Sequence, residues 1–178
     1  GEAGGPDIST ISRTDEAVYF GAGVNMTDVL ETIRDDYPSY AEMIRRYGSV
    51  QVRNAATIGG NIANGSPIGD NPPALIALDA TLHLRLRDVE RSVAIEDFFI
   101  AYGKQDRAPG ELVTGVTVPL GQDALRCYKL SKRFDQDISA VGGAFNIVIS
   151  ERVVTSARVA FGGRAGTPEV VTAVEAVI

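Results

Sequence analysis

The chain is organised around the stretch Ala56-Thr57-Ile58-Gly59-Gly60-Asn61-Ile62-Ala63-Asn64-Gly65-Ser66-Pro67-Ile68-Gly69-Asp70. Its glycines, asparagines and proline exclude one continuous helix or strand. Gly59 and Gly60 can adopt backbone angles closed to other residues, and they let a ligand approach the peptide N–H groups closely. A long surface turn explains the same composition, and on composition alone the two interpretations weigh equally.

The residues that follow this loop favour a ligand site. Asp70-Asn71-Pro72 is expected to open a short helix, because Asp and Asn cap helices well and proline suits the first turn. A helix N-terminus next to bare glycine amides is a common arrangement for binding phosphate oxygens. Side chains that could bind sugar hydroxyls are Thr57, Asn61, Asn64 and Ser66. The loop therefore predicts a pocket for a nucleotide-like ligand.

Composition limits the class of protein. The 178 residues are 44% hydrophobic and carry a net charge of −6, which is typical of a soluble globular protein. No basic stripe indicates nucleic acid, and no apolar run is long enough for a membrane span. One cysteine and one histidine exclude an internal disulfide and a zinc or iron–sulfur cluster within this chain. These features predict a cytoplasmic protein that binds neither nucleic acid nor membrane.

The ends of the sequence predict a fragment. It starts without Met or a signal peptide and stops at Ile178 within an apparently helical stretch. We therefore expect a piece of a longer protein.

Before the loop, the pattern predicts a strand over 17–20 and two helices. Asn25 is the expected N-cap of an amphipathic helix over 26–36. Ser39 and Glu42 have capping-box spacing for a second helix, closed by Gly48. Tyr47, in the last turn of this helix beside the glycine loop, is the member of its apolar stripe that could also contact a ligand.

After the loop, the pattern predicts an α+β arrangement. His83 lies on the polar face of an expected strand and is predicted to be solvated. A subdomain boundary is expected over 119–124, followed by a three-stranded antiparallel sheet. Thr167-Pro168-Glu169 is expected to cap a final helix carrying Val170, Val174, Val177 and Ile178. The other expected elements are a buried helix over 72–78, strands over 82–86, 91–95 and 112–118, a loop over 103–110, and sheet strands over 125–132, 140–150 and 153–161.

Residue patterns alone do not assemble a catalytic centre. There is no Gly-x-Gly-x-x-Gly after a strand and no Gly-Lys-Ser/Thr. Cys127 and His83 lie on separate expected strands, so no Ser/His/Asp or Cys/His set can be built. If the protein is an enzyme, a bound cofactor carries its chemistry.

The run over 50–70 resembles the flavin-binding signature of the molybdopterin hydroxylases, and most closely the small FAD and iron–sulfur subunits of bacterial xanthine dehydrogenases. The similarity extends through nearly the whole chain, over 98–99, 102–107, 130–140 and 160–163. It implies the second lobe of a PCMH-type FAD-binding domain over 1–119. A small α/β C-terminal domain of the CO dehydrogenase flavoprotein type, incomplete at its end, would follow over 120–178. The family's first FAD lobe and its iron–sulfur domains are absent from this sequence.

The resemblance also implies which residues bind the cofactor. Thr57, Ile58, Gly59, Gly60 and Asn61 correspond to the loop that wraps FAD, while Asn64 and Asp70 resemble further polar contacts. Tyr47 stands where the family often has Phe near the flavin ring, and Val113 resembles an apolar contact to that ring. Lys129 resembles a cofactor-contacting lysine, although a strand-end lysine reaching for water explains it too. No metal ligand and no catalytic side chain is implied.

The implied function is the last electron-transfer step of purine hydroxylation. Electrons would pass from iron–sulfur centres through FAD to NAD, with the loop Arg133 to Ile138 on the nicotinamide side and Asp137 near the flavin. The implied partners are iron–sulfur domains and a molybdenum-binding subunit, in a hetero-oligomer. Two alternatives stay open: the flavin subunit of an aldehyde or carbon monoxide dehydrogenase, and a flavin-free interaction module.

Overall fold

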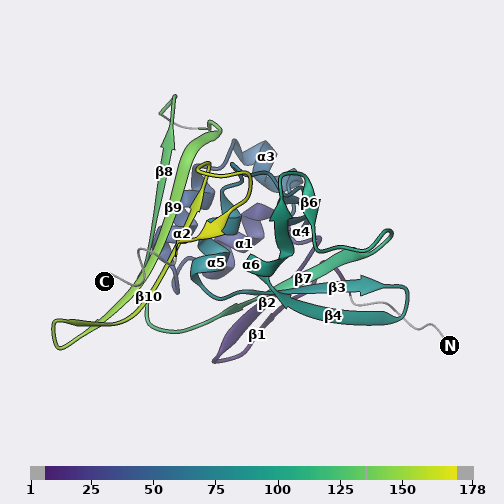
Figure 1. Ribbon diagram of the computed structural model, residues 1–178, viewed down its shortest axis with the longest axis horizontal. Helices are drawn as coiled ribbons and strands as arrows, with labels where there is room; N and C mark the ends of the chain where they lie inside the picture. Colours follow the sequence, from purple (N-terminus) through teal and green to yellow (C-terminus); the bar gives the residue numbers. More distant parts are fainter. Residues whose placement is uncertain (1–6, 135, 172–178) are drawn as a thin grey trace.

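The computed structural model describes residues 7–134 and 136–171. Two antiparallel sheets enclose a layer of helices between them (Figure 1). The larger sheet has the order β1-β2-β7-β3-β4. Its strands are β1 (Ile11–Arg13), β2 (Ala17–Gly21), β7 (Leu112–Pro119), β3 (Thr81–Leu86) and β4 (Val89–Ala94).

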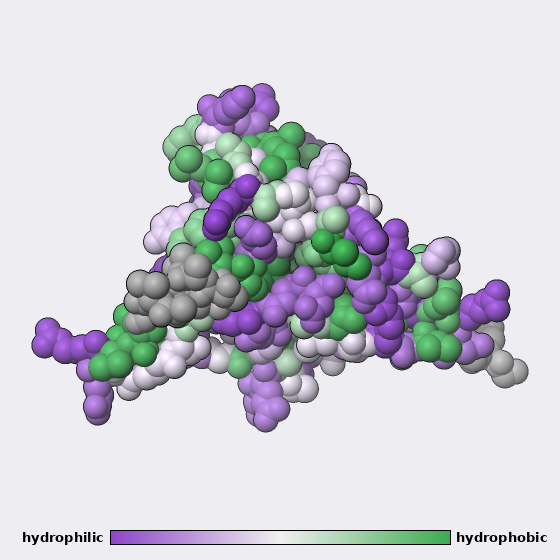
Figure 2. Space-filling view, viewed as in Figure 1, coloured by the Kyte–Doolittle hydropathy of each residue, from purple (hydrophilic) through white to green (hydrophobic). Residues whose placement is uncertain are grey.

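The smaller sheet has the order β11-β10-β9-β8, and a separate hairpin pairs β5 with β6. Its strands are β11 (Glu169–Val170), β10 (Val153–Gly162), β9 (Ser139–Ser150) and β8 (Leu125–Ser131). The hairpin consists of β5 (Phe99–Ala101) and β6 (Lys104–Gln105). Apolar side chains reach the surface at both ends of this smaller sheet (Figure 2).

The helical layer joins the two sheets into one core. Its helices are α1 (Met26–Ile33), α2 (Pro38–Arg45), α3 (Val50–Ala55), α4 (Ile58–Ala63), α5 (Asn71–Ala77) and α6 (Ile95–Phe98). Helix α5 is buried along its whole length and packs on β9 and β10, while α4 packs on β7. Phe20 of the larger sheet and Leu125 of the smaller one belong to the same buried cluster. The α+β fold with antiparallel sheets is as expected, and the boundary at residue 119 stays a prediction.

Several local predictions are confirmed, and others are wrong for identifiable reasons. Asn25 caps α1, since its side chain accepts from the Asp28 amide at 2.9 Å. The helix ends at Ile33, however, and not at residue 36. The capping box at Ser39 does not form, because Pro38 already begins α2 and Ser39 Oγ accepts from the Cys127 amide at 2.8 Å. The hydroxyl thus holds strand β8 on α2.

The sequence predictions also missed short elements. The sequence does not predict strand β1, helix α3 or the β5–β6 hairpin, nor the short helix α4 within the stretch that is expected to form no continuous helix or strand. Each is six residues or fewer, so hydrophobic periodicity has too few positions to be recognised.

The end of the described chain differs from the prediction. Glu169 and Val170 form strand β11, paired with Phe161 and Ala160 of β10, and do not begin a helix. The edge of the smaller sheet offers ladder partners that outweigh the local capping signal. Residues 172–178, with Val174, Val177 and Ile178 of the expected final helix, lie outside the described residues.

His83 is half-buried and hydrogen-bonded on both ring nitrogens, so it is less solvated than predicted. Its Nδ1 lies 2.8 Å from Ser92 Oγ and its Nε2 lies 2.7 Å from Thr117 Oγ1. Ser92 of β4 lies opposite His83. Thr117 of β7 lies diagonal to it, since the register pairs Thr117 with Thr81. Desolvation on burial lowers the pKa of His83 below its ordinary value of 6.5.

This lowered pKa predicts that the protein loses stability as the pH falls from 7.5 to 5.5. The unfolded chain takes up a proton at the ordinary pKa, whereas the folded chain resists protonation until a lower pH, so acid favours unfolding. His83 is the only histidine in the sequence, so His83→Gln should remove most of the slope. Melting temperatures across this range test it, and equal slopes in both proteins would contradict it.

Candidate functional site

A pocket of about 430 Å³ opens beside the loop that organises the sequence. It lies where the end of α2, helix α4, the turn over 64–70 and the loop over 136–139 meet. Four of the residues that the family resemblance assigns to FAD binding line it: Tyr47, Asn61, Asn64 and Asp70. The other lining residues are Gly48, Ser49, Val52, Ser66, Ile68, Gly69, Gln136, Asp137, Ile138 and Ser139. Hydrogen-bonding groups and exposed apolar side chains therefore share one wall.

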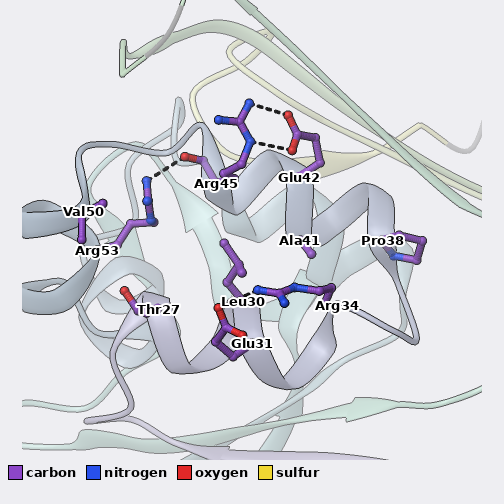
Figure 3. A pocket seen from close by; sticks show the side chains of 10 residues that line it. All are labelled: Thr27, Leu30, Glu31, Arg34, Pro38, Ala41, Glu42, Arg45, Val50 and Arg53. Carbon is purple, nitrogen blue, oxygen red and sulfur yellow. Dashed lines mark hydrogen bonds and ion pairs between the residues drawn. The ribbon is translucent and has the colours of Figure 1, made fainter.

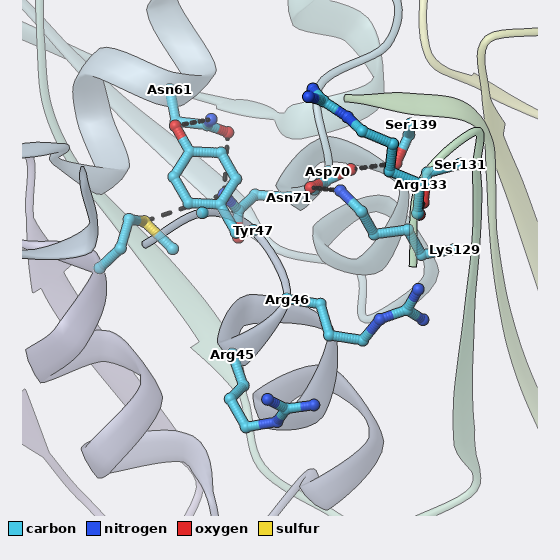
Figure 4. A network of polar contacts seen from close by, with 12 residues as sticks. Arg45, Arg46, Tyr47, Asn61, Asp70, Asn71, Lys129, Ser131, Arg133 and Ser139 are labelled. Atoms are coloured by element: carbon cyan, nitrogen blue, oxygen red, sulfur yellow. Dashed lines mark hydrogen bonds and ion pairs between the residues drawn. The ribbon is translucent and has the colours of Figure 1, made fainter. Parts of the chain in front are cut away.

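Asp70 and Lys129 form a buried ion pair at the edge of this pocket (Figure 4). Lys129 Nζ lies 2.5 Å from Asp70 Oδ2, and the two side chains are only 2% and 6% exposed. Ser139 Oγ donates to the other carboxylate oxygen of Asp70. Lys129 is thus drawn inward by a carboxylate, and the alternative of a strand-end lysine reaching for water is wrong.

A second polar network enters the pocket from the core. Asn71, with no exposed surface, donates from Nδ2 to Asn61 Oδ1 at 2.9 Å and accepts from Tyr40 Oη at 2.9 Å. Asn61 Nδ2 in turn donates to Tyr47 Oη at 3.4 Å. Figure 4 shows Asn71, Asn61 and Tyr47 in sequence along this path. The network holds Tyr47 and Asn61 in place at the pocket wall.

The amides of the glycine loop are predicted to be free for a ligand, and this prediction is wrong. The N–H groups of Ile58 and Gly59 donate to Val24 O at 2.9 Å and Ala22 O at 3.0 Å. Gly60 N–H donates to the Thr57 side chain at 3.1 Å, which makes Thr57 the N-cap of α4. The first turn of α4 is therefore already satisfied by the protein.

The helix N-terminus after the loop is also a weaker anion site than predicted. Asp70 precedes α5 but makes no side-chain capping hydrogen bond, because its carboxylate faces Lys129 and Ser139. The first turn of α5 contains Pro72 and Pro73, which have no N–H to offer an anion.

Gly59 and Gly60 also differ from their predicted backbone conformation. Both are helical residues of α4, and the glycine of this stretch with a positive φ is Gly65, at 60°. Gly59 is needed for close packing, since a Cβ there would lie 2.4 Å from the Ala22 Cβ. Gly60 is exposed beside Asn61.

The remaining predicted site residues do not line the pocket. Ile58 is fully buried in the core, and Thr57, half-buried, pairs with Asn25 in an isolated β-bridge. Val113 is a half-buried residue of β7, opposite Leu84. Helix α4 packs on β7, so these residues belong to the structure that carries α4 and not to the pocket lining.

Asp137 lines one side of the pocket as a paired carboxylate. Asp137 accepts from the Arg133 side chain and from the Arg133 amide, both at 2.9 Å. The hydrogen bond from the Arg133 side chain lowers the pKa of Asp137 to about 2. Asp137 thus stays ionised at neutral pH and holds the loop in shape.

Sequence reasoning missed the supporting residues Tyr40, Asn71 and Ser139. In the sequence, Tyr40 belongs to an apolar stripe and Asn71 belongs to a helix cap. Neither position indicates a polar network. A useful signal is Asn71 itself, because a buried amide at the start of an otherwise apolar helix needs hydrogen-bond partners.

A second hollow lies between α1, α2 and α3 and does not match the predicted site. Figure 3 shows Arg45 facing Glu42 and Arg53 reaching the backbone of residue 45. Arg34 is paired with Glu31 at 2.6 Å. Because its arginines have partners within the protein, this hollow has no clear ligand chemistry. Among the described residues, no group of His, Cys, Asp and Glu side chains could hold a metal ion, and no helix is long and apolar enough to cross a membrane.

Two family models match the sequence. Residues 4–121 match the FAD binding domain in molybdopterin dehydrogenase, and residues 126–178 match the CO dehydrogenase flavoprotein C-terminal domain. A nicotinate hydroxylase of Emericella nidulans is 37% identical over 71% of this chain and 10% of its own length. A xanthine dehydrogenase of Calliphora vicina is 31% identical over 93% of this chain and 14% of its own length.

Solved structures share the fold. The carbon monoxide dehydrogenase from Hydrogenophaga pseudoflava superposes with a TM-score of 0.90 at 27% identity, over 97% of this chain and 61% of that one. Quinoline 2-oxidoreductase from Pseudomonas putida 86 has a TM-score of 0.83 at 22% identity, over 92% of this chain and 57% of that one, and this likeness concerns the fold alone. The chain spans only 10% of the length of the nicotinate hydroxylase and 14% of the length of the xanthine dehydrogenase.

Proposed function

The chain belongs to the family of FAD-binding domains of molybdopterin dehydrogenases, and from this premise we propose that it binds FAD as part of a xanthine dehydrogenase-type oxidoreductase. The observation that carries the proposal is the pocket beside α4, where Tyr47, Asn61 and Asn64 meet in the segment matched by the FAD-binding family. Relatives named as xanthine dehydrogenases and a nicotinate hydroxylase are all oxidoreductases.

The chemistry of the pocket fits part of a flavin nucleotide. Val52 and Ile68 are 47% and 38% exposed, and a flat aromatic ring system would cover such apolar side chains. The hydroxyl and amide groups of Tyr47, Asn61 and Asn64 can bind ring heteroatoms or hydroxyls. The pocket volume of about 430 Å³ suits one portion of a dinucleotide, so a second lobe would have to enclose the rest.

The proposed roles of the protein groups are to bind and orient. Bound FAD would supply the redox chemistry, accepting electrons from iron–sulfur centres and passing two of them with a proton to NAD. Asn61 and Tyr47 would contact the cofactor directly. Asp70 and Lys129 would fix the edge of the pocket, and the Arg133–Asp137 pair would hold the loop on the acceptor side.

The proposed partners follow from the same premise. Iron–sulfur domains and a molybdenum-binding subunit would deliver electrons from a hydroxylated purine, in a cytoplasmic hetero-oligomer. The carbon monoxide dehydrogenase fold match supports a second candidate, the flavin subunit of a carbon monoxide dehydrogenase-type enzyme. Activity of the assembled enzyme with xanthine or with carbon monoxide separates the two.

Flavin retention tests the FAD proposal. We expect the isolated chain to purify colourless and to bind FAD with micromolar or weaker affinity, because an open pocket leaves much of the ligand in water. The assembled enzyme should contain about one FAD for each copy of this chain. Absorbance of the desalted chain and fluorescence titration with FAD measure the first expectation. FAD released on denaturing the assembled enzyme measures the second, because iron–sulfur centres absorb in the same region as flavin.

The two parts of this expectation fail differently. An assembled enzyme without flavin would contradict FAD binding and favour a flavin-free interaction module. An isolated chain that stays yellow through desalting would show instead that this lobe suffices by itself.

A further inference from the structure

The hydrogen-bond path from the core to the pocket runs through four side chains. Tyr40 Oη lies 2.9 Å from Asn71 Oδ1, and Asn71 Nδ2 lies 2.9 Å from Asn61 Oδ1. Asn61 Nδ2 lies 3.4 Å from Tyr47 Oη. An amide offers a donor on one side and an acceptor on the other. The direction of the first hydrogen bond therefore determines the direction of all the others.

Tyr40 determines one direction. It is 1% exposed, and burial raises the pKa of its hydroxyl, which keeps its proton. If the Asn71 amide were reversed, its NH₂ group would face Tyr40, and that proton would lose the acceptor it has here. A buried donor without an acceptor is costly, because it has lost its hydrogen bonds to water and gained none in return. Tyr40 therefore donates to Asn71.

Met26 supports the same direction from the opposite side of the amide. Its Sδ lies 3.8 Å from Asn71 Nδ2. A thioether sulfur is a weak acceptor and never a donor. A reversed amide would place Asn71 Oδ1 against this sulfur, with no hydrogen between two electron-rich atoms. Two neighbours on different elements thus favour one orientation of Asn71.

The consequence reaches the pocket. Asn61 must turn its Oδ1 toward Asn71, so its NH₂ group points at Tyr47 and donates to the phenolic oxygen. The hydroxyl hydrogen of Tyr47 then has no role within this path and is available to a ligand. Tyr47 itself lines the pocket.

We propose that Tyr47 is a directed hydrogen-bond donor to an acceptor atom of the flavin bound in the pocket, and that Asn71 is the positioning residue that sets this direction. The proposal rests on the proposed function for the identity of the ligand. The hydroxyl of Tyr47 would add one specific contact to the apolar area that its ring offers at the pocket wall.

Nuclear Overhauser measurements on the isolated chain test the direction without any ligand. We expect the Asn71 side-chain NH₂ hydrogens to show contacts with the Met26 methyl group and the Asn61 side chain. Contacts of those hydrogens with the Tyr40 ring, and none with Met26, would reveal the reversed amide and overturn the proposal.

Flavin binding to the assembled enzyme tests the donor. Tyr47→Phe removes the hydroxyl and keeps the ring, so FAD should dissociate about three- to tenfold more readily, as expected for one lost neutral hydrogen bond. The flavin absorption spectrum should shift as well. Tyr37→Phe is the matched control, because it removes a buried hydroxyl that donates to Pro119 O at 3.0 Å, away from the pocket.

Asn71→Asp tests the positioning role. Burial favours the neutral form of this carboxyl, so the variant is measured at a pH high enough to ionise it. The carboxylate then accepts from Tyr40 but cannot donate to Asn61, so Asn61 turns its NH₂ group inward and presents Oδ1 to Tyr47. The Tyr47 hydroxyl then donates to Asn61. This variant should reproduce the spectral shift of Tyr47→Phe, and the double variant should show that same shift without addition.

Each result has a distinct meaning. A wild-type enzyme without flavin contradicts the proposed function, while the Overhauser contacts still report on the direction. A flavin-loaded wild type with unchanged affinity and spectrum in Tyr47→Phe overturns the donor proposal. Additive spectral shifts in the double variant overturn the positioning role of Asn71. If Asn71→Asp does not fold, Tyr47→Phe and the Overhauser contacts still decide the proposal.

Discussion

Asp70→Ala is expected to lower the free energy of unfolding by about 3–5 kcal/mol, because it leaves the buried ammonium group of Lys129 without its carboxylate. Lys129 is 2% exposed and lies 2.5 Å from Asp70. For a chain of this size, the melting temperature should fall by roughly 6–20 °C. Urea denaturation and thermal melts of the isolated chain measure the change.

A matched set of variants tests whether the loss of stability comes from the unpaired buried charge or would follow the removal of any ion pair. Arg34→Ala breaks a pair whose side chains are 53% and 56% exposed, and it should cost less than about 1 kcal/mol. The double variant Asp70→Ala/Lys129→Met removes both buried charges and should regain much of the loss. An Asp70→Ala protein within 1 kcal/mol of wild type would contradict the buried-pair interpretation.

Because of this ion pair, a variant at Asp70 or Lys129 can lose flavin through partial unfolding as well as through a lost contact. Direct contact of both groups with FAD was the implication of the family resemblance, and here each has the other as its partner. Flavin retention should therefore be measured well below the melting temperature of each variant. Loss under those conditions reports on the pocket and not on unfolding.

Gly59→Ala is expected to destabilise the protein by about 1–3 kcal/mol or more, through overpacking of α4 against the chain at Ala22. An added Cβ would lie 2.4 Å from the Ala22 Cβ and 2.7 Å from the Ala22 Cα and O. Two of these three atoms are backbone, so a rotamer change cannot relieve the clash. The helix must shift, and Asn61 moves with it away from the pocket wall.

Gly121→Ala is the matched control for Gly59→Ala. A Cβ at Gly121 would meet nothing within 4 Å, so this substitution should leave the melting temperature nearly unchanged. Equal melting temperatures for both variants would show that the structure around Ala22 accommodates the added Cβ with no loss of stability.

Local sequence signals predicted much of the fold because they act over a few residues. The alternation in the segment around Leu82, Leu84 and Leu86 predicted a half-buried strand, and β3 is found there. The Asn25 cap and the apolar spacing behind it predicted α1. The prediction of a final helix is wrong at Glu169 and Val170, which pair with β10. This pairing depends on a strand edge that lies nearby only in the folded protein.

The candidate site was only partly visible in the sequence. The glycines and polar residues over 56–70 marked its position, and Tyr47, Asn61, Asn64 and Asp70 line the pocket. The predicted free amides were wrong, since Ala22 and Val24 supply their acceptors from another part of the chain. Local composition does not reveal whether a backbone group already has a partner.

The sequence by itself determined the family, the α+β class and the place of the pocket, because these depend on motif, periodicity and short-range capping. Only the tertiary structure decided the partners of the polar groups. Lys129 and Asp70 are 59 residues apart, and Tyr40 and Asn71 are 31 apart. The packing of β8 and α2 around α5 brings these groups together, and burial then requires each donor to find an acceptor. That requirement, and no local pattern, gives the Asn71 amide its orientation.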